Sequence, residues 1–180
     1  MIEYKDLLEL DEKGFEEFAQ LNYQTFGLVE GVDSQVIRKK CKENKLTCMV
    51  FYEDNEMIGS VTYMLTEKMA YYLFIVVSPT QRSKGYGSKF LQILNEKYSD
   101  RQKLVEIDTI SEKDASDYDI RVSRCNFYKR NGFHLTDQKV IINGLLFDVM
   151  CTDGELLLDE YSKLIKIERE FVDQIELVEK

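Results

Sequence analysis

Between Phe74 and Ser88 a hydrophobic strand runs into a glycine-containing loop, and the loop opens a helix. Such a junction aims unpaired backbone N–H groups and the positive end of the helix dipole at one point, which favours phosphate binding. Gly85 and Gly87 would let the backbone approach an anion without an intervening Cβ atom. The segment therefore predicts a site for a phosphate-bearing ligand.

Two familiar phosphate loops do not fit this segment. A P-loop requires G-x-x-x-x-G-K-[ST], and the order Gly85-Tyr86-Gly87-Ser88-Lys89 does not provide it. A dinucleotide-binding loop requires G-x-G-x-x-G directly after a strand, but here the third glycine is missing and the polar segment 78–84 intervenes. An ordinary strand-to-helix turn is the remaining alternative to an anion site.

Three segments together resemble the GNAT superfamily of acyl-CoA-dependent N-acetyltransferases. The R-x-x-G-x-G pattern of Arg82–Gly87 resembles its cofactor signature, and Asn126–Phe133 resembles a landmark helix that ends in Tyr before Gly-Phe. Upstream, Asp54–Gly59 resembles the turn of a characteristic β-hairpin. These landmarks follow the expected order over roughly residues 47 to 150.

The resemblance implies a fold and a cofactor. The fold would be a single-domain α/β structure with a mixed, mostly antiparallel sheet, helices on both faces and a splayed pair of parallel strands. Acetyl-CoA would be the acyl donor, with its pantetheine arm paired to the backbones of Ile75 and Val77. The amides that bind its pyrophosphate would be those of Arg82, Ser83, Lys84, Gly85, Tyr86, Gly87 and Ser88.

Composition narrows the class of protein. A chain of 180 residues with 44% hydrophobic and 32% charged residues is typical of one globular domain. Four cysteines without metal-site spacing, together with one histidine, predict reduced thiols and no metal site, as expected for a cytoplasmic protein. The excess of 33 acidic over 24 basic residues argues against nucleic-acid binding and mildly favours a cationic partner. No apolar run is long enough for a membrane span, and the first residues lack a signal-peptide layout.

Hydrophobic periodicity predicts the elements that would position these residues. We expect a strand near residues 2–8, helices capped by Asp11 and Asp33, and strands at 47–53, 57–66 and 69–77. A helix at about 86–98 then leads to a strand at 104–109, so the strands on either side of this helix should be parallel. A helix near 120–130 and strands near 133–136 and 139–152 complete the expected N-acetyltransferase domain, residues 1–152.

Tyr128 is the candidate general acid. Acetyl transfer to an amine requires removal of a proton from the amine and protonation of the leaving thiolate. A phenol with an ordinary pKa near 10 suits the second task, and Tyr128 stands at the landmark tyrosine of the family. The alternative is a packed tyrosine whose hydroxyl only contacts the cofactor sulfur.

Glu106 and Asp108 are the candidate bases. They alternate on the strand 104–109 and should therefore share one face. We favour Glu106 over Asp108; acids that merely face solvent, or a reaction whose base is water, are the alternatives. No Ser–His or Cys–His pairing is evident, and His134 is expected to be structural.

Four acids lie in the segment 111–119, next to the candidate bases. They could attract a polycationic amine or simply form a solvated loop. A common family pattern has Asn seven residues before the landmark tyrosine, but this position is Arg121. Arg124 instead resembles the arginine of subfamilies with R-x-x-x-Y, which places side-chain contacts to pantetheine from this helix in doubt.

The C-terminal segment, residues 153–180, is expected to form an amphipathic helix. Apolar residues recur at spacings of four and three, with Glu168 as the polar interruption. Such a helix would pack on its own domain or form a homodimer.

The sequence thus predicts an N-acetyltransferase that modifies a primary amine of a small cationic molecule. The alternatives are a non-catalytic acyl-CoA-binding module and a protein N-acetyltransferase.

Overall fold

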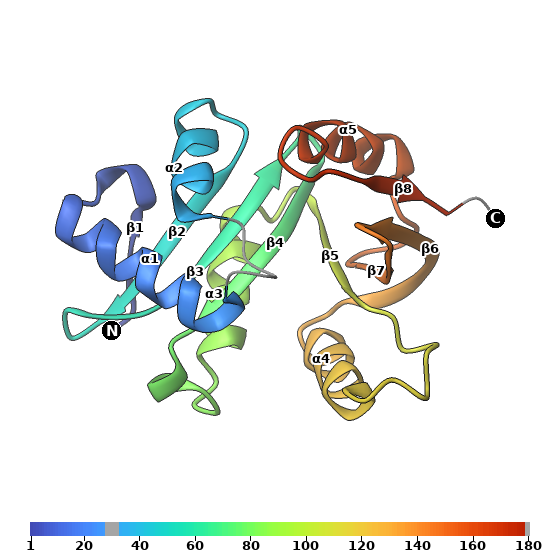
Figure 1. Ribbon diagram of the computed structural model, residues 1–180, viewed down its shortest axis with the longest axis horizontal. Helices are drawn as coiled ribbons and strands as arrows, with labels where there is room; N and C mark the ends of the chain where they lie inside the picture. The colour runs from blue at the N-terminus through green and yellow to red at the C-terminus, as the bar shows by residue number, and fades with distance from the viewer. Residues whose placement is uncertain (28–32, 179–180) are drawn as a thin grey trace. The chain divides into compact units, whose positions relative to one another are not determined.

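The computed structural model describes residues 1–27 and 33–178 (Figure 1). Within this part of the chain, eight strands form one mixed sheet in the order β1-β2-β3-β4-β5-β7-β6-β8. The strands are β1 (Glu3–Asp6), β2 (Thr47–Glu53), β3 (Glu56–Leu65), β4 (Met69–Val77), β5 (Gln102–Asp108), β6 (His134–Ile142), β7 (Leu145–Cys151) and β8 (Ile175–Leu177). The α-helices are α1 (Glu12–Phe26), α2 (Ser34–Lys42), α3 (Tyr86–Lys97), α4 (Tyr118–Arg130) and α5 (Leu158–Glu168). The predicted fold class is confirmed.

The chain divides into two compact units. Unit 1 comprises Met1–Leu65 and Tyr72–Lys97, and unit 2 comprises Thr66–Tyr71 and Tyr98–Lys180. Strand β4 begins in unit 2 and continues in unit 1. Each unit is described by itself below.

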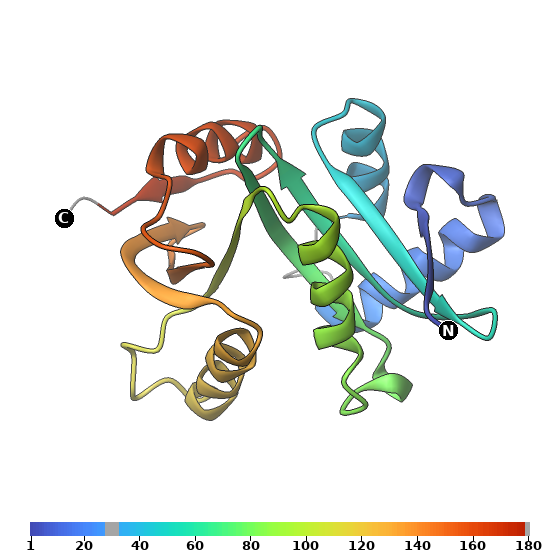
Figure 2. The same cartoon turned by 180° about the vertical axis from the view of Figure 1, so that it is seen from behind.

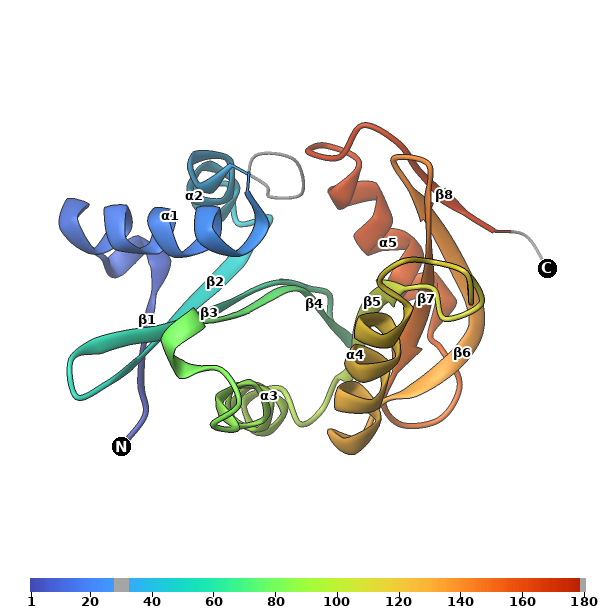
Figure 3. The same cartoon turned by 60° about the horizontal axis from the view of Figure 1, so that its bottom comes forward.

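Helix capping fixes the start of the first two helices of unit 1. The Asp11 side chain accepts a hydrogen bond from the Gly14 N–H at 2.8 Å, and Asp33 accepts one from the Gln35 N–H at 2.6 Å, as the sequence predicts. The inner face of α1 buries Phe15 and other apolar residues in the core. Figure 3 shows α1 and α2 on one side of β2 and β3, and α3 on the other.

Helix α3 packs closely on the sheet at Gly59 of β3. A Cβ atom at Gly59 would lie 2.2 Å from the Val76 carbonyl oxygen and 2.6 Å from the Phe90 ring, so no larger residue fits without displacement. The Phe90 ring also stacks on Phe51, with ring centroids 4.1 Å apart and an interplanar angle of 13°. The first turns of α3 are thereby held against β2 and β3.

Unit 2 contains the parallel strand pair. Met69–Tyr71 of β4 pair in parallel with Gln102–Leu104 of β5, as the strand–helix–strand order predicts. Strand β7 pairs antiparallel with β5, and β6 pairs antiparallel with both β7 and β8. Among the described residues, the ladder between β4 and β5 is confined to those three pairs.

Two sequence predictions near the C-terminus are wrong in detail. The strand expected over 139–152 is a hairpin, because Asn143 and Gly144 turn the chain with φ angles of 49° and 81° between β6 and β7. The helix expected over 153–180 spans only Leu158–Glu168, and Ile175–Leu177 form β8 beside β6. Pairing with the open edge of β6 is available to this segment and replaces further helix.

No helix in the described ranges combines the length and the apolar character that a membrane span requires.

Candidate active site

The loop before α3 adopts a conformation that leaves backbone amides unpaired. A short 3₁₀ helix, Pro79–Gln81, follows β4, and Ser83 and Gly85 then have φ angles of 63° and 82°. The Lys89 N–H donates to the Gly85 carbonyl at 3.2 Å and closes the first turn of α3. The N–H groups at the start of a helix have no intrahelical acceptor, so those of Tyr86 to Ser88 remain for a ligand. Figure 2 shows this loop beneath α3.

Hydrogen bonds to neighbouring residues hold three side chains at the loop and at the start of α3. Arg82 donates from Nε to the Val77 carbonyl at 3.4 Å, and Lys84 donates from Nζ to Oε1 of Gln81 at 2.9 Å. The Tyr86 hydroxyl donates to Glu53, which anchors the first residue of α3 to the end of β2. The two cations therefore stay near the unpaired amides, where they add positive charge to the helix N-terminus.

Glu106 lies half-buried on β5 in unit 2, with phenol groups around its carboxylate. Tyr161 of α5 donates its hydroxyl proton to Oε1 of Glu106, and the phenol of Tyr71 on β4 lies near enough to stabilise this carboxylate. Burial raises the pKa of Glu106 to about 7, although the two phenols act in the opposite direction. A carboxyl group with this pKa can accept a proton near neutral pH.

Asp108, two residues further along β5, has a cation as its partner instead of phenols. Its carboxylate forms an ion pair with Arg124 of α4, and the residue is half-buried. This ion pair occupies Oδ2 of the carboxylate. The two candidate bases therefore have partners from different helices: Arg124 of α4 pairs with Asp108, and Tyr161 of α5 donates to Glu106.

Tyr128 lies near the C-terminal end of α4 and is 9% exposed. Its ring packs edge-on against Phe127 and Phe133, at centroid distances of 5.1 and 5.5 Å. Burial raises the pKa of Tyr128 to about 12, and the charge of Arg124 opposes this rise. The phenol is therefore protonated at every working pH, and its hydroxyl has no hydrogen-bond partner among the described residues.

Arg121 organises the acidic segment 111–119. Its guanidinium contacts Glu112 at 3.0 Å and Asp117 at 2.9 Å, and it also donates to the Thr109 carbonyl at 3.3 Å. Two of the four acids of the segment thus share one positive charge. The residue that departs from the family pattern has a structural role here, as the counter-ion of this loop.

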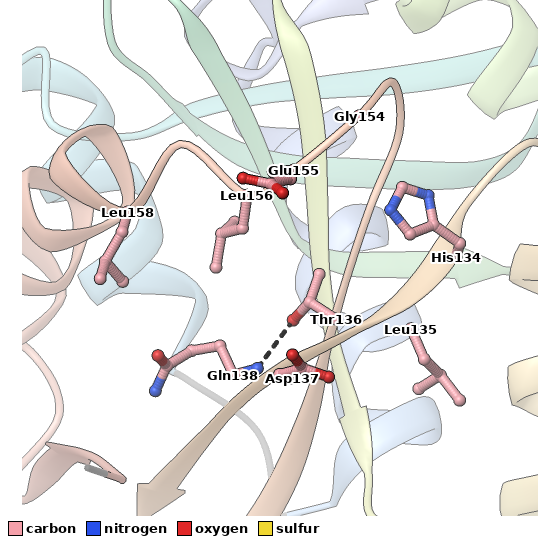
Figure 4. Close-up of a pocket in the computed structure, with 9 residues that line it drawn as sticks. All are labelled: His134, Leu135, Thr136, Asp137, Gln138, Gly154, Glu155, Leu156 and Leu158. Atoms are coloured by element: carbon pink, nitrogen blue, oxygen red, sulfur yellow. Dashed lines mark hydrogen bonds between the residues drawn. The ribbon is translucent and has the colours of Figure 1, made fainter. Parts of the chain in front are cut away.

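A cavity of about 350 Å³ lies elsewhere in unit 2 (Figure 4). Its lining includes His134 and Glu155 but neither Glu106 nor Tyr128. His134 Nε2 lies 3.7 Å from the Sγ atom of Cys151, a Cys–His contact that the sequence did not indicate. Cys151 is fully buried, and burial raises the pKa of its thiol to about 11, so it is not a thiolate nucleophile at neutral pH. All four cysteines are free and buried, as expected.

Three residues beside Glu106 were missed as site residues. Tyr71, Tyr161 and Glu168 come from β4 and α5, and they are 2%, 0% and 3% exposed. Glu168 carried a sequence signal, because it is the one polar residue in the apolar stripe of the C-terminal segment. The two tyrosines carried none, since aromatic residues at such positions are ordinary core residues.

Comparisons with known proteins agree with this architecture. The profile of the acetyltransferase (GNAT) domain matches residues 44–135. No curated protein sequence matches the chain. A solved structure described as a GNAT-family acetyltransferase from Bacteroides thetaiotaomicron superimposes with a TM-score of 0.71 at 19% identity, covering 92% of this chain and 96% of that one.

Two further solved structures have informative descriptions. One is an aminoglycoside 6′-N-acetyltransferase in complex with coenzyme A, with a TM-score of 0.64 and 12% identity over 84% of this chain and 96% of that one. The other is a chimeric spermidine N-acetyltransferase from Vibrio cholerae, with a TM-score of 0.61 and 15% identity over 92% of this chain and 98% of that one. At these identities the structures show a common fold, while the domain match covers half of the sequence. The chain therefore belongs to the GNAT family and is an acetyl-CoA-dependent N-acetyltransferase.

Proposed function

We propose that the protein transfers the acetyl group of acetyl-CoA directly to a primary amine of a small cationic molecule, with Glu106 as general base and Tyr128 as general acid. The observation that carries the proposal is the half-buried carboxyl group of Glu106, whose pKa of about 7 suits proton transfer at neutral pH. Acetyl-CoA supplies the acetyl group as a thioester. The protein must hold this donor, remove a proton from the amine and protonate the leaving sulfur.

Residues 82–88 fit the phosphates of the donor. The left-handed conformations at Ser83 and Gly85 precede the unpaired amides at the start of α3, and Arg82 and Lys84 lie in the same loop. A helix N-terminus with adjacent cations is a suitable environment for a pyrophosphate. The backbones of Ile75 and Val77 are proposed to pair with the pantetheine arm, as the family resemblance implies. The Val77 carbonyl already accepts a long hydrogen bond from Arg82, which leaves this acceptor only weakly engaged.

Glu106 is the better base because its proton affinity is closer to that of an amine. An alkylammonium group has a pKa near 10.4, whereas an ordinary glutamate has a pKa of about 4.3. A pKa of about 7 removes roughly half of this mismatch. The Asp108 carboxylate, by contrast, is already engaged in an ion pair with Arg124.

Tyr128 suits the acid role because it keeps its proton. With a pKa of about 12 it remains a neutral donor while negative charge develops on the sulfur. Its hydroxyl has no acceptor within the described ranges, so it is available to the leaving group. No covalent intermediate is needed, and the buried Cys151 thiol is unsuited to form one.

A cationic acceptor is supported by charge. The chain carries a formal net charge of −9, which favours the approach of cations over anions. Two structural relatives are described as acting on an aminoglycoside and on spermidine, both of which are polyamines. In the described structure Arg121 pairs with Glu112 and Asp117, so Asp114 and Asp119 are the acids of this loop that do not pair with that arginine.

The direct test is release of CoA thiol from acetyl-CoA in the presence of a panel of acceptors. We expect turnover with at least one polyamine or aminoglycoside, and none with anionic amino acids. Turnover with peptides alone would instead indicate a protein N-acetyltransferase. Tight acetyl-CoA binding without turnover on any member of a broad panel would favour a non-catalytic acyl-CoA-binding module.

Gly87→Glu should weaken acetyl-CoA binding at least tenfold by calorimetry, because a carboxylate at the start of α3 would repel the pyrophosphate. Gly87→Gln is the matched control, since it adds nearly the same bulk without charge. Equal affinities of Gly87→Glu and the unmodified protein, with the fold intact by circular dichroism, would remove the anion-binding role from this loop.

Glu106→Gln should lower kcat/KM by about 10² to 10⁴ and abolish its acidic limb near pH 7, because an amide cannot accept the proton. In the unmodified enzyme kcat/KM should fall as pH drops below about 7, where the Glu106 carboxylate becomes protonated. Asp108→Asn serves as the comparison and should preserve the limb. A limb that disappears in Asp108→Asn and persists in Glu106→Gln would transfer the base role to Asp108.

Tyr128→Phe should lower kcat by about 10² to 10⁴ with little change in the affinity for acetyl-CoA, since the phenol acts chiefly in the transition state. No alkaline loss of activity from Tyr128 ionisation is expected below about pH 11, given its pKa of about 12. Phe127→Leu is a control for packing at the same helix end. Unchanged kcat in Tyr128→Phe would leave this tyrosine a packing role only.

A further inference from the structure

The cavity in Figure 4 is separate from the residues proposed for acetyl transfer. Its volume is about 350 Å³, it is built within unit 2, and no residue proposed as an acid, a base or a cofactor contact lines it in the described structure. One wall comes from the first half of β6, and the segment between β7 and α5 lies across from it. A cavity of this size can hold a small ligand.

An irregularity in β6 forms the first wall. The pairing of β6 with β7 shifts between Leu135 and Lys139. Within this stretch the Thr136 hydroxyl donates to the Val149 carbonyl at 3.0 Å and accepts a hydrogen bond from the Gln138 N–H at 3.1 Å. Bulges of this kind change the direction of side chains and are frequent beside functional sites. Here the bulge directs three consecutive residues of β6 to the cavity.

Gln102 of β5 holds the opposite wall. It is 7% exposed, and its Nε2 atom lies 2.9 to 3.0 Å from the carbonyl oxygens of Thr152, Asp153 and Glu155. Its Oε1 atom accepts a hydrogen bond from the Leu157 N–H at 3.0 Å. Both walls are therefore fixed by internal hydrogen bonds, and a preformed cavity binds a ligand without the cost of ordering its walls.

Gln138 contributes an acceptor to this cavity. The residue is 8% exposed, and its Nε2 atom donates to the carbonyl oxygens of Lys139 at 2.8 Å and Val178 at 3.0 Å. These bonds orient the amide, and its Oε1 atom accepts no hydrogen bond from the described residues. A buried amide oxygen without a donor costs free energy. A ligand with an N–H group would satisfy it.

The charge of the lining selects the kind of ligand. Asp137 and Glu155 contribute carboxylates, and none of the lining residues is lysine or arginine. Within the described ranges no three His, Cys, Asp or Glu side chains converge in a way that could hold a metal ion, so an organic cation fits better than a metal. Apolar surface is also present, from Leu135, Leu156 and Leu158.

We propose that this cavity binds a small aliphatic amine in its ammonium form, at a site distinct from that of acetyl transfer. The ammonium group has three N–H donors, which suit the Gln138 Oε1 atom and the carboxylates of Asp137 and Glu155. The carbon chain of the amine would lie on the leucine side chains. The proposal does not depend on the role of Glu106.

NMR titration tests the proposal directly. His134 lines the cavity and is the only histidine of the chain, so its imidazole C–H signals report on this place alone. Addition of 1,5-diaminopentane at constant pH and ionic strength should shift these signals to saturation with a Kd of about 1 mM or lower. The uncharged 1,5-pentanediol should bind at least about tenfold more weakly. No saturable shift with the diamine, or equal affinity for the diol, would overturn the proposal.

Removal of the two carboxylates should weaken the binding. Asp137→Asn combined with Glu155→Gln should raise the Kd of the diamine at least about tenfold. The matched control combines Asp173→Asn with Glu176→Gln, two exposed acids of the same unit that do not line the cavity. Both double variants change the net charge equally, so equal affinities would indicate only general attraction and would refute the site. If the first double variant does not fold, the same comparison holds between Glu155→Gln and Glu176→Gln.

The same titration in Glu106→Gln separates this site from the proposed function. The His134 shift and its Kd should be unchanged, because Glu106 does not line the cavity. If Glu106→Gln is fully active and the shift persists, the base assignment fails and the amine site stands. If the shift is lost in Glu106→Gln, the signal reports an amine at the catalytic site and the separate site is wrong.

Discussion

The start of helix α3 depends on a close approach that only glycine permits. At Gly59 the sheet backbone and the Phe90 ring occupy the space that a side chain would need. Phe90 is fully buried and stacks on Phe51, so α3 cannot slide along the strands without losing this contact. The direction of the amides that follow Gly85 therefore depends on the packing of Phe90, about one helical turn further along α3.

A second constraint acts in unit 2, where carboxyl groups are buried without cations. Two other half-buried or buried acids of this unit have basic partners: Asp108 pairs with Arg124, and Asp148 pairs with Lys139. Glu106 and Glu168 have phenols instead. Phenols donate hydrogen bonds without supplying charge, so they satisfy the oxygens but do not offset the cost of ionisation. Burial therefore raises the proton affinity of both carboxyl groups, and the phenols lower it only in part, whereas an arginine in the same place would lower it further.

Local patterns were sufficient to predict most of the fold from the sequence. The caps at Asp11 and Asp33, the alternating strands and the loop before α3 each depend on residues close together in the chain. The turn at Asn143-Gly144 carried a clear signal, and treating 139–152 as one strand overlooked it. The structure of the C-terminal segment could not be predicted from local patterns. Its pairing as β8 requires the edge of β6, which lies more than thirty residues earlier in the chain.

The residues of the candidate site were likewise predictable only where the signal was local. Residues 82–88, Tyr128 and the acids of β5 could be named from motif and alternation alone. The network around Glu106 could not, because Tyr71, Tyr161 and Glu168 come from distant segments and meet only after folding. Asp108 and Glu106 also looked equivalent in sequence, and the ion pair with Arg124 is what distinguishes them.

Burial acts on the two proposed catalytic groups in the same direction and yet prepares them for opposite tasks. It raises the pKa of Glu106 to about 7 and that of Tyr128 to about 12. For the carboxyl group the shift increases proton affinity while still leaving a large fraction ionised near neutral pH. For the phenol the higher pKa prevents ionisation at the working pH, so the hydroxyl remains a proton donor. One physical effect, applied to an acid that is ordinarily charged and to one that is ordinarily neutral, thus supplies a base that titrates near neutral pH and an acid that keeps its proton.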